Sequence, residues 1–351
     1  MNSKKKTLHP LLVAAIVLLA LSLILCTFVF TLWLHGKNTM TQTNSAPHFP
    51  HQDENVPLES SNRNIIEYNN KRYQYNENMI NILLVGIDSD LNPSEAAGSV
   101  DQADVLVLAA LNLEDKEMSL INLSRDIVCD IEITDNNGQN AELVHTQLAL
   151  SYAYGDGQHG SCELTRDAVS NIFYGLPIQG YGAYYINGIA DLNDAVGGVT
   201  VDFIYDYPYW VCGEGAKRLT EELHGTQVTL SGTEAVVYVR MRDEEAIDAN
   251  ERRIVRQKQY MLGLISQAKK KLLENPVSLL TIYDAVDDYI LTDLSFSDIS
   301  YLATQAVSMD FTEDIRNVSG DLLVNDEGVV EVHVDQDALY ALMLDVFYTE
   351  I

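Results

Sequence analysis

Hydrophobic positions divide the 351-residue chain into three blocks. An uncharged, almost wholly apolar run covers residues 11–34, and a polar stretch rich in Asn, Gln, Ser, Thr and Pro follows over 36–62. From about residue 78 onward, short β-branched runs alternate with stretches of helical spacing. Such alternation of strands and helices predicts a layered α/β domain.

The short apolar runs predict strands at Ile80–Ile87, Asp104–Leu111, Met118–Leu123 and Val199–Ile204. Helical spacing predicts helices at Glu142–Tyr154, Cys162–Tyr174, Asp191–Ala195, Asn250–Leu273, Ser297–Met309 and Asp335–Tyr348. A further helix is expected to begin at Ser231, because Glu234 stands three residues later and completes a capping box.

The apolar run predicts a membrane anchor. About 20 residues at ~1.5 Å per residue cross the hydrocarbon core, and the run ends in bulky aromatic residues, including Trp33, that suit the membrane interface. Lys4, Lys5 and Lys6 precede the run and are expected to stay in the cytoplasm. We therefore expect a single-pass protein of the cell membrane with an extracellular C-terminal domain.

This reading divides the chain into five segments. Residues 1–10 form a cytoplasmic tail, 11–34 a transmembrane helix, and 35–77 an extracellular linker whose composition cannot bury a core. The ordered catalytic domain is expected over 78–275, and a C-terminal α/β extension, packed on the same domain, over 276–351.

Composition and motifs exclude several function classes. The chain has 22 basic and 51 acidic residues, a net charge of −29, so a nucleic-acid partner is not expected. HExxH and GxSxG patterns are absent, and the GxGxxG match at Gly155–Gly160 follows a helical pattern rather than a strand, which favours a solvated turn. The part expected to be extracellular has three cysteines, Cys129, Cys162 and Cys212. This odd number allows one disulfide and one free thiol.

Arginines are concentrated in one short stretch. Five of the eleven fall between 240 and 256: Arg240, Arg242, Arg252, Arg253 and Arg256. Guanidinium groups bind phosphate oxygens with two parallel hydrogen bonds, so this cluster predicts a phosphate pocket. On a helix Arg252 and Arg256 share one face, and Arg253 and Gln257 share the neighbouring one. The alternative is that the arginines pair on the surface with Glu244, Glu245, Asp248 and Glu251.

Acidic residues stand where the predicted strands begin and end. Asp88 follows the first strand, Asp104 opens the second, and Arg125 and Asp126 follow the third. If the strands are neighbours, these groups meet at one sheet edge, where two carboxylates beside arginines outline a Mg²⁺–pyrophosphate site. Taken singly, each acid also fits a turn or a helix cap.

Several of these segments together resemble the LytR-CpsA-Psr family of cell-envelope proteins. In family order, the matching stretches are Asn81–Asp88, Ala103–Asp104, Asn122–Asp126, Ser151–Gly155, Leu192–Val199, Tyr238–Arg242 and Arg253–Gln257. The resemblance implies an α/β/α sandwich with a mixed central sheet and an apolar pocket for a polyprenyl chain. It also implies transfer of an anionic glycopolymer from an undecaprenyl-diphosphate carrier to peptidoglycan.

The resemblance carries roles to individual positions. It implies that Asp88 and Asp104 bind Mg²⁺, and that the pyrophosphate is bound by Arg125, Arg240, Arg242, Arg253 and Gln257, beside Arg256 of the cluster. Asp126 and Asp248 are candidates for the base that accepts the proton of the attacking hydroxyl. The chain departs from the family pattern at Gln102, Gln147, Ala149 and Asn250. These departures keep two alternatives open: a non-catalytic envelope-binding or sensing protein, and a hydrolase of the lipid-linked donor.

Overall fold

The computed structural model describes residues 27–351 except 28, 43–44, 49–63, 90, 135–140, 207–216, 242, 244–248 and 312–314. Its centre is a mixed sheet with the order β11–β8–β3–β4–β5–β12, and β13 also pairs with β5. The strands are β3 (Met79–Ile87), β4 (Val105–Asn112), β5 (Glu117–Leu123), β8 (Gly180–Tyr185), β11 (Ile290–Thr292), β12 (Asp310–Phe311) and β13 (Arg316–Asn317). β3 runs antiparallel to β4 and parallel to β8. The predicted strands Ile80–Ile87, Asp104–Leu111 and Met118–Leu123 are confirmed.

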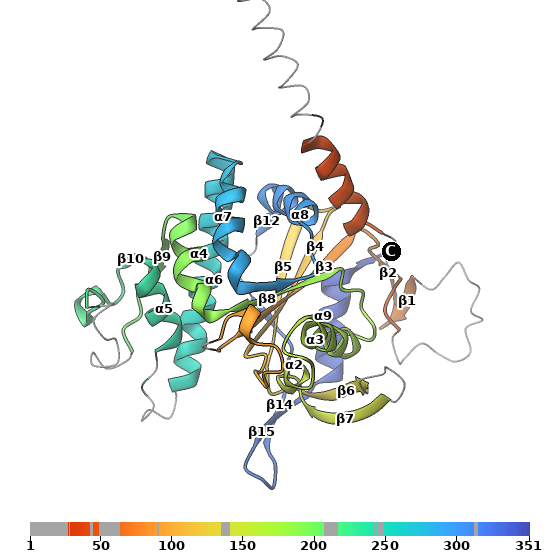
Figure 1. The fold of residues 1–351 in the computed structure, drawn as a ribbon. Helices are drawn as coiled ribbons and strands as arrows, with labels where there is room; N and C mark the ends of the chain where they lie inside the picture. Colours follow the sequence, from red (N-terminus) through yellow and green to blue (C-terminus); the bar gives the residue numbers. More distant parts are fainter. Residues whose placement is uncertain are drawn as a thin grey trace, which may run out of the picture.

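Helices cover both faces of this sheet (Figure 1). They are α2 (Leu150–Ala153), α3 (His159–Ile172), α4 (Ile189–Val196), α5 (Gly232–Arg240), α6 (Ala249–Glu274), α7 (Ser278–Val286), α8 (Phe296–Ser308) and α9 (Gln336–Phe347). Alternate residues of β3 point to opposite faces. Leu83 and Val85 enter a core with α3 and α9, whereas Ile80 and Ile82 enter a second core with α6 and α8. The fold is therefore an α/β/α sandwich, as expected.

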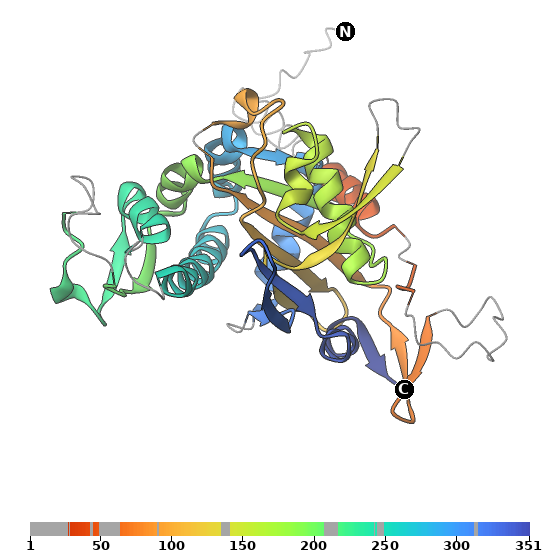
Figure 2. The ribbon, with the colours of Figure 1, turned by 90° about the horizontal axis from the view of Figure 1, so that it is seen from below.

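A smaller lobe stands beside the sheet, as Figure 2 shows. It consists of α4, α5 and the antiparallel pair β9 (Val199–Asp202) and β10 (Gln227–Leu230). Its own apolar core includes Val199, Leu230 and Tyr238. Tyr260 of α6 also enters this core, while Met261 and Leu262 pack toward the main sheet. Helix α6 thus joins the lobe to the sandwich.

Three small strand groups at the periphery correct the expected elements. β1 (Ile65–Tyr68) and β2 (Lys71–Tyr75) pair with each other and with β16 (Tyr348–Glu350), so the ordered domain begins before Asn78, inside the range predicted as a linker. β6 (Val128–Thr134) pairs with β7 (Ala141–Gln147). The helix predicted over Glu142–Tyr154 is therefore wrong as far as Gln147, and only α2 forms within it. β14 (Gly320–Val324) and β15 (Val330–Val334) form a projecting hairpin.

Residues 29–40 are helical and dock on the domain. The indole of Trp33 donates a hydrogen bond to the Thr304 hydroxyl of α8 (3.1 Å) and meets the Tyr301 ring edge-on. Met40 is buried in the same core. Trp33 was expected at the membrane interface. In the structure it packs on α8, where the Thr304 hydroxyl accepts its indole N–H. Most of the predicted anchor (11–34) lies outside the described residues, and within the described part no helix is long and apolar enough to cross a membrane.

Two of the three cysteines of the predicted extracellular part lie in the core. Cys129 and Cys162 are both buried and both free. Cys212 lies outside the described residues. Burial raises the pKa of each described thiol to about 12, so neither is a thiolate at neutral pH.

Candidate functional site

The two candidate metal ligands leave the sheet at one edge. Gly86 of β3 pairs with Val105 of β4, and the backbone N–H of Asp104 donates to the Gly86 carbonyl (2.9 Å). Asp88 stands two residues beyond Gly86, and Asp104 one residue before Val105. Because β3 and β4 are antiparallel, the end of one and the start of the other coincide. The structure thus brings the two acids to neighbouring positions, as the strand pattern predicts.

The end of β5 adds two charged groups to the same edge. Arg125 forms an ion pair with Asp104 and lies 3.8 Å from the Asp126 carboxylate. Backbone hydrogen bonds hold the segment, since Ala149 N–H donates to the Arg125 carbonyl (2.9 Å) and Ala103 N–H donates to the Ala149 carbonyl (3.1 Å). Three segments far apart in the sequence are thereby joined at this edge.

Asp126, a candidate base, is held at this edge by a hydrogen bond from a side-chain amide. The Gln147 side-chain amide donates to its carboxylate (3.0 Å) and also to the Val330 carbonyl of β15 (2.8 Å). Burial raises the pKa of Asp126 above its ordinary value, although the Arg125 guanidinium acts in the opposite direction. A raised pKa brings a carboxylate closer to the pH at which it is an efficient base. Gln147, one of the departures from the family pattern, orients this candidate base.

Arg240 reaches the same edge from the smaller lobe. Its guanidinium lies 3.1 Å from the Asp88 carboxylate, and the two side chains remain 33% and 37% exposed. Arg240 is the last residue of α5, and Met241 after it is extended. A ligand can therefore approach both Arg240 and Asp88 from solvent.

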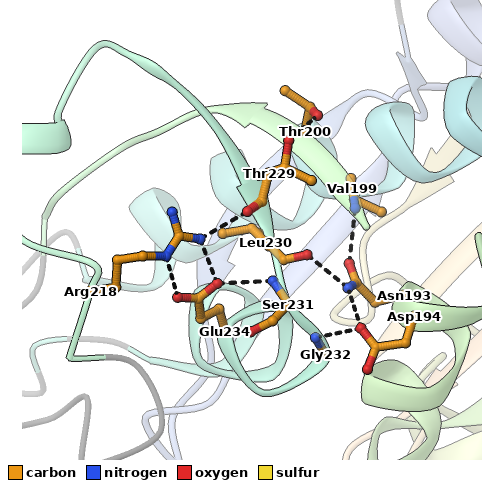
Figure 3. A network of polar contacts seen from close by, with 10 residues as sticks. All are labelled: Asn193, Asp194, Val199, Thr200, Arg218, Thr229, Leu230, Ser231, Gly232 and Glu234. Carbon is orange, nitrogen blue, oxygen red and sulfur yellow. Dashed lines mark hydrogen bonds and ion pairs between the residues drawn. The ribbon is translucent and has the colours of Figure 1, made fainter. Parts of the chain in front are cut away.

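Polar contacts fix the N-terminal end of α5 (Figure 3). Ser231 and Glu234 form the predicted capping box. Arg218 binds both oxygens of Glu234 (2.8 and 2.7 Å), and Asp194 accepts the Gly232 N–H (2.8 Å). Burial alone would raise the pKa of Glu234, but the hydrogen bonds from Arg218 and Ser231 outweigh it and lower that pKa. This end of the helix is anchored by a buried carboxylate.

Side chains of α6 fix the C-terminal end of α5. Arg256 donates to the backbone carbonyls of Tyr238 and Met241, and Gln257 donates to the carbonyl of Val239 (3.1 Å). The last carbonyls of a helix have no partner within it, so these contacts satisfy them. Both residues were predicted to bind substrate. Through these contacts both residues orient the backbone that carries Arg240.

Arg256 corrects the expected arginine pocket most clearly. Its side chain is fully buried, forms an ion pair with Asp206 (3.0 Å) and lies over the Tyr238 ring. A phosphate cannot reach it there. Asp206 was missed, because nothing in the sequence links an acid to an arginine fifty positions away. Arg252 is exposed and Arg253 is partly buried, so the two neighbours do diverge.

Arg242 and Asp248 lie outside the described residues. Among the residues that are described, no group of three or more His, Cys, Asp or Glu side chains is arranged to hold a metal ion. Asp88 and Asp104 supply two carboxylates, which fits Mg²⁺ bound through one or two carboxylates and completed by substrate phosphates. Their arginine partners would share those phosphates.

A family model decides what this arrangement belongs to. The model of the LytR_cpsA_psr family matches residues 35–339. The chain belongs to this family. An Enterococcus faecalis relative named polyisoprenyl-teichoic acid–peptidoglycan teichoic acid transferase TagU is 29% identical over 293 residues, 80% of this chain and 81% of the relative. A Bacillus licheniformis protein of the same name is 25% identical over 64% of this chain and 63% of its own length.

Solved structures share the fold of this chain. A Streptococcus agalactiae protein superposes with a TM-score of 0.61 at 21% identity, covering 76% of this chain and 86% of its own. TagT bound to LIIa-WTA gives 0.56 at 20% identity over 77% and 89%, and Bacillus subtilis TagV gives 0.55 at 19% over 76% and 95%. At these identities the likeness concerns the fold. It agrees with the sandwich described above.

Proposed function

We propose that this protein is an extracytoplasmic phosphotransferase that attaches an anionic glycopolymer from a polyprenyl-diphosphate carrier, of the undecaprenyl type, to peptidoglycan. The observation that carries the proposal is the convergence of two guanidinium–carboxylate pairs, Arg240–Asp88 and Arg125–Asp104, at one half-exposed sheet edge. Family membership and the transferase names of its relatives supply the substrate class.

The arginines suit a diphosphate donor. Arg240 comes from the smaller lobe and Arg125 from the main sheet, so a ligand between them is held from two sides. When bound by Asp88 and Asp104, Mg²⁺ would neutralise charge on the donor's phosphate oxygens. The guanidinium groups stabilise the charge that develops on the departing polyprenyl phosphate.

The chemistry is a single displacement at phosphorus. A peptidoglycan hydroxyl attacks the phosphorus attached to the glycopolymer, forming a phosphodiester. The bond from that phosphorus to the bridging oxygen breaks, and polyprenyl phosphate leaves with the electron pair. Asp126, whose raised pKa suits a base, accepts the hydroxyl proton, and Asp248 is the second candidate.

A product assay tests the proposal. The full-length protein, reconstituted in vesicles, is incubated with Mg²⁺ and a polyprenyl-diphosphate-linked glycan, with and without peptidoglycan. We expect glycan bound to peptidoglycan through a phosphodiester, together with released polyprenyl phosphate, only when both substrates are present.

Two other outcomes would contradict the proposal. Free glycan released without peptidoglycan would identify a hydrolase. Binding of the donor without any product would identify a non-catalytic envelope-binding or sensing protein, which the substitutions at Gln102 and Asn250 would then explain. The Arg252→Ala variant, which lacks an exposed arginine of α6, serves as a control. It should give the same products as the unsubstituted protein.

A further inference from the structure

The turn between α6 and α7 exposes apolar side chains next to lysines. Leu273, Val277 and Leu280 are 61%, 66% and 55% exposed. The stretch 269–283 contains Lys269, Lys270 and Lys271 but a single acid, Glu274. In a chain of net charge −29, a local excess of positive charge beside exposed aliphatic residues is an unusual surface.

The exposed residues are displayed by a well-packed scaffold. The buried Ser278 hydroxyl donates to the Asn275 carbonyl (2.6 Å), which closes the turn. On the protein side of α7, Tyr283 meets the Phe296 ring edge-on at 5.3 Å, and Ile282 packs against the core of the smaller lobe. The Lys269 ammonium donates to the Met309 carbonyl (2.5 Å). Fraying of a loosely held turn therefore does not explain the exposure.

The N-terminal helix leaves the domain at the same end. In Figure 1 the α6–α7 turn and the helix of residues 29–40 both lie at the upper end of the molecule, and the β14–β15 hairpin projects from the lower end. Residues 29–40 are held firmly, because a Cβ on Gly36 would lie 2.2 Å from the Ser297 carbonyl oxygen of α8. The orientation of this helix on the domain is thus fixed by close packing.

We propose that the α6–α7 turn rests on the surface of the lipid bilayer, with Leu273, Val277 and Leu280 in the interface and Lys270 and Lys271 at anionic headgroups. The proposal rests on the expected anchor at 11–34, whose last residues, 29–34, form the first part of the docked helix. The chain's two runs of three lysines, 4–6 and 269–271, would then lie on opposite sides of the membrane. Aliphatic side chains beside lysines are the usual composition of an interfacial contact.

A second copy of the chain fits this surface less well. Two molecules of charge −29 repel each other, and a symmetric contact would set the lysines of one turn against those of the other. Anionic lipid offers opposite charge and an apolar layer together. The occupant argued for is therefore an anionic lipid surface.

Site-specific quenching tests the proposal on the full-length protein in phosphatidylglycerol vesicles. An environment-sensitive thiol probe is placed by Val277→Cys and, as a matched control, by Leu322→Cys on the hairpin, a position that is 67% exposed. The unsubstituted protein gives the labelling background of the native cysteines. We expect quenchers carried on the lipid acyl chains to quench the probe at 277 and not the one at 322.

The lysine contribution is measured with Lys270→Glu in the Val277→Cys protein. One lysine near an anionic surface contributes about 1 kcal/mol, so removing it should lower the docked-to-undocked ratio at least about fivefold. Vesicles of phosphatidylcholine alone should also reduce quenching at 277.

Each contrary result overturns the proposal. Equal quenching of the probes at 277 and 322 would mean that the α6–α7 turn makes no oriented contact with the bilayer. Quenching at 277 that is unchanged by Lys270→Glu would mean the same. Probe protection that depends on protein concentration and not on lipid would identify a second copy as the occupant. Failure of the unsubstituted protein to float with the vesicles would remove the anchor on which the proposal rests.

Discussion

Helix α6 carries arginines in its first turns and lysines in its last turns. Arg256 and Lys270 are 14 residues apart, which is about 21 Å along the helix axis. At the arginine end, Arg256 is fully buried against Asp206 and two backbone carbonyls. At the lysine end, Lys270 is exposed beside Leu273. A planar guanidinium satisfies several fixed acceptors at once, whereas an ammonium group supplies charge without that geometry. The arginine end of α6 is therefore a region of defined hydrogen bonds, whereas Lys270 at the lysine end presents its charge without a fixed partner geometry.

The largest effect is expected from Arg256→Ala. It leaves the Asp206 carboxylate buried without its ion-pair partner and removes donors from the end of α5. Breaking a buried pair in this way costs about 3–5 kcal/mol. Denaturant unfolding of the full-length protein should show this loss.

Arg252→Ala is the control for that measurement, one helical turn earlier on α6. An exposed arginine contributes about 0–1 kcal/mol, so its removal should be nearly neutral. Equal stability of the Arg256→Ala and Arg252→Ala variants would show that the buried arginine is not a structural element. The arginine end of α6 would then not differ from the lysine end in this respect.

The next largest effect is expected from Arg240→Lys on the transfer rate. Lysine keeps the charge but loses the two-pronged donor, so the loss should approach that of Arg240→Ala. A charge-assisted hydrogen bond contributes about 1.5–3 kcal/mol, which corresponds to roughly ten- to a hundredfold in rate. Unfolding should be measured on the same samples. Full activity of the lysine variant would show that Arg240 acts only as a surface charge.

A smaller effect concerns Asp126 and pH. As a base it must be deprotonated, so the transfer rate should fall as the pH drops through its raised pKa. Arg125 lowers this pKa, and Arg125→Gln should therefore move the acid limb of the normalised rate profile to higher pH. The pH midpoint is read independently of the absolute rate. An unmoved limb would assign the proton transfer to another group, Asp248 first.

Periodicity was enough to predict the sandwich strands, because β3, β4 and β5 are buried on both faces and read as continuous apolar runs. It failed at Glu142–Gln147, where partly exposed residues carry little pattern and the decisive factor is pairing with β6. It failed again at β1 and β2, whose partner β16 is the last strand of the chain. Long-range pairing is invisible to a local pattern.

The candidate site divides in the same way. Asp88, Asp104, Arg125 and Asp126 could be placed at one edge because strand ends locate them. The roles within the arginine cluster could not be assigned from the sequence. Spacing on α6 tells which helix face each arginine occupies, but not which part of the protein that face contacts. Asp206 and the end of α5 decide that Arg256 is structural.

The central claim, that the sheet edge holds a Mg²⁺–diphosphate donor, is tested most directly by a structure of the full-length protein with Mg²⁺ and a polyprenyl diphosphate. We expect donor phosphate oxygens at ~2.7–2.9 Å from the guanidinium nitrogens of Arg240 or Arg125. Mg²⁺ should lie at ~2.0–2.1 Å from a carboxylate oxygen of Asp88 or Asp104. A diphosphate bound elsewhere, with the Arg240–Asp88 and Arg125–Asp104 pairs unchanged, would contradict the account.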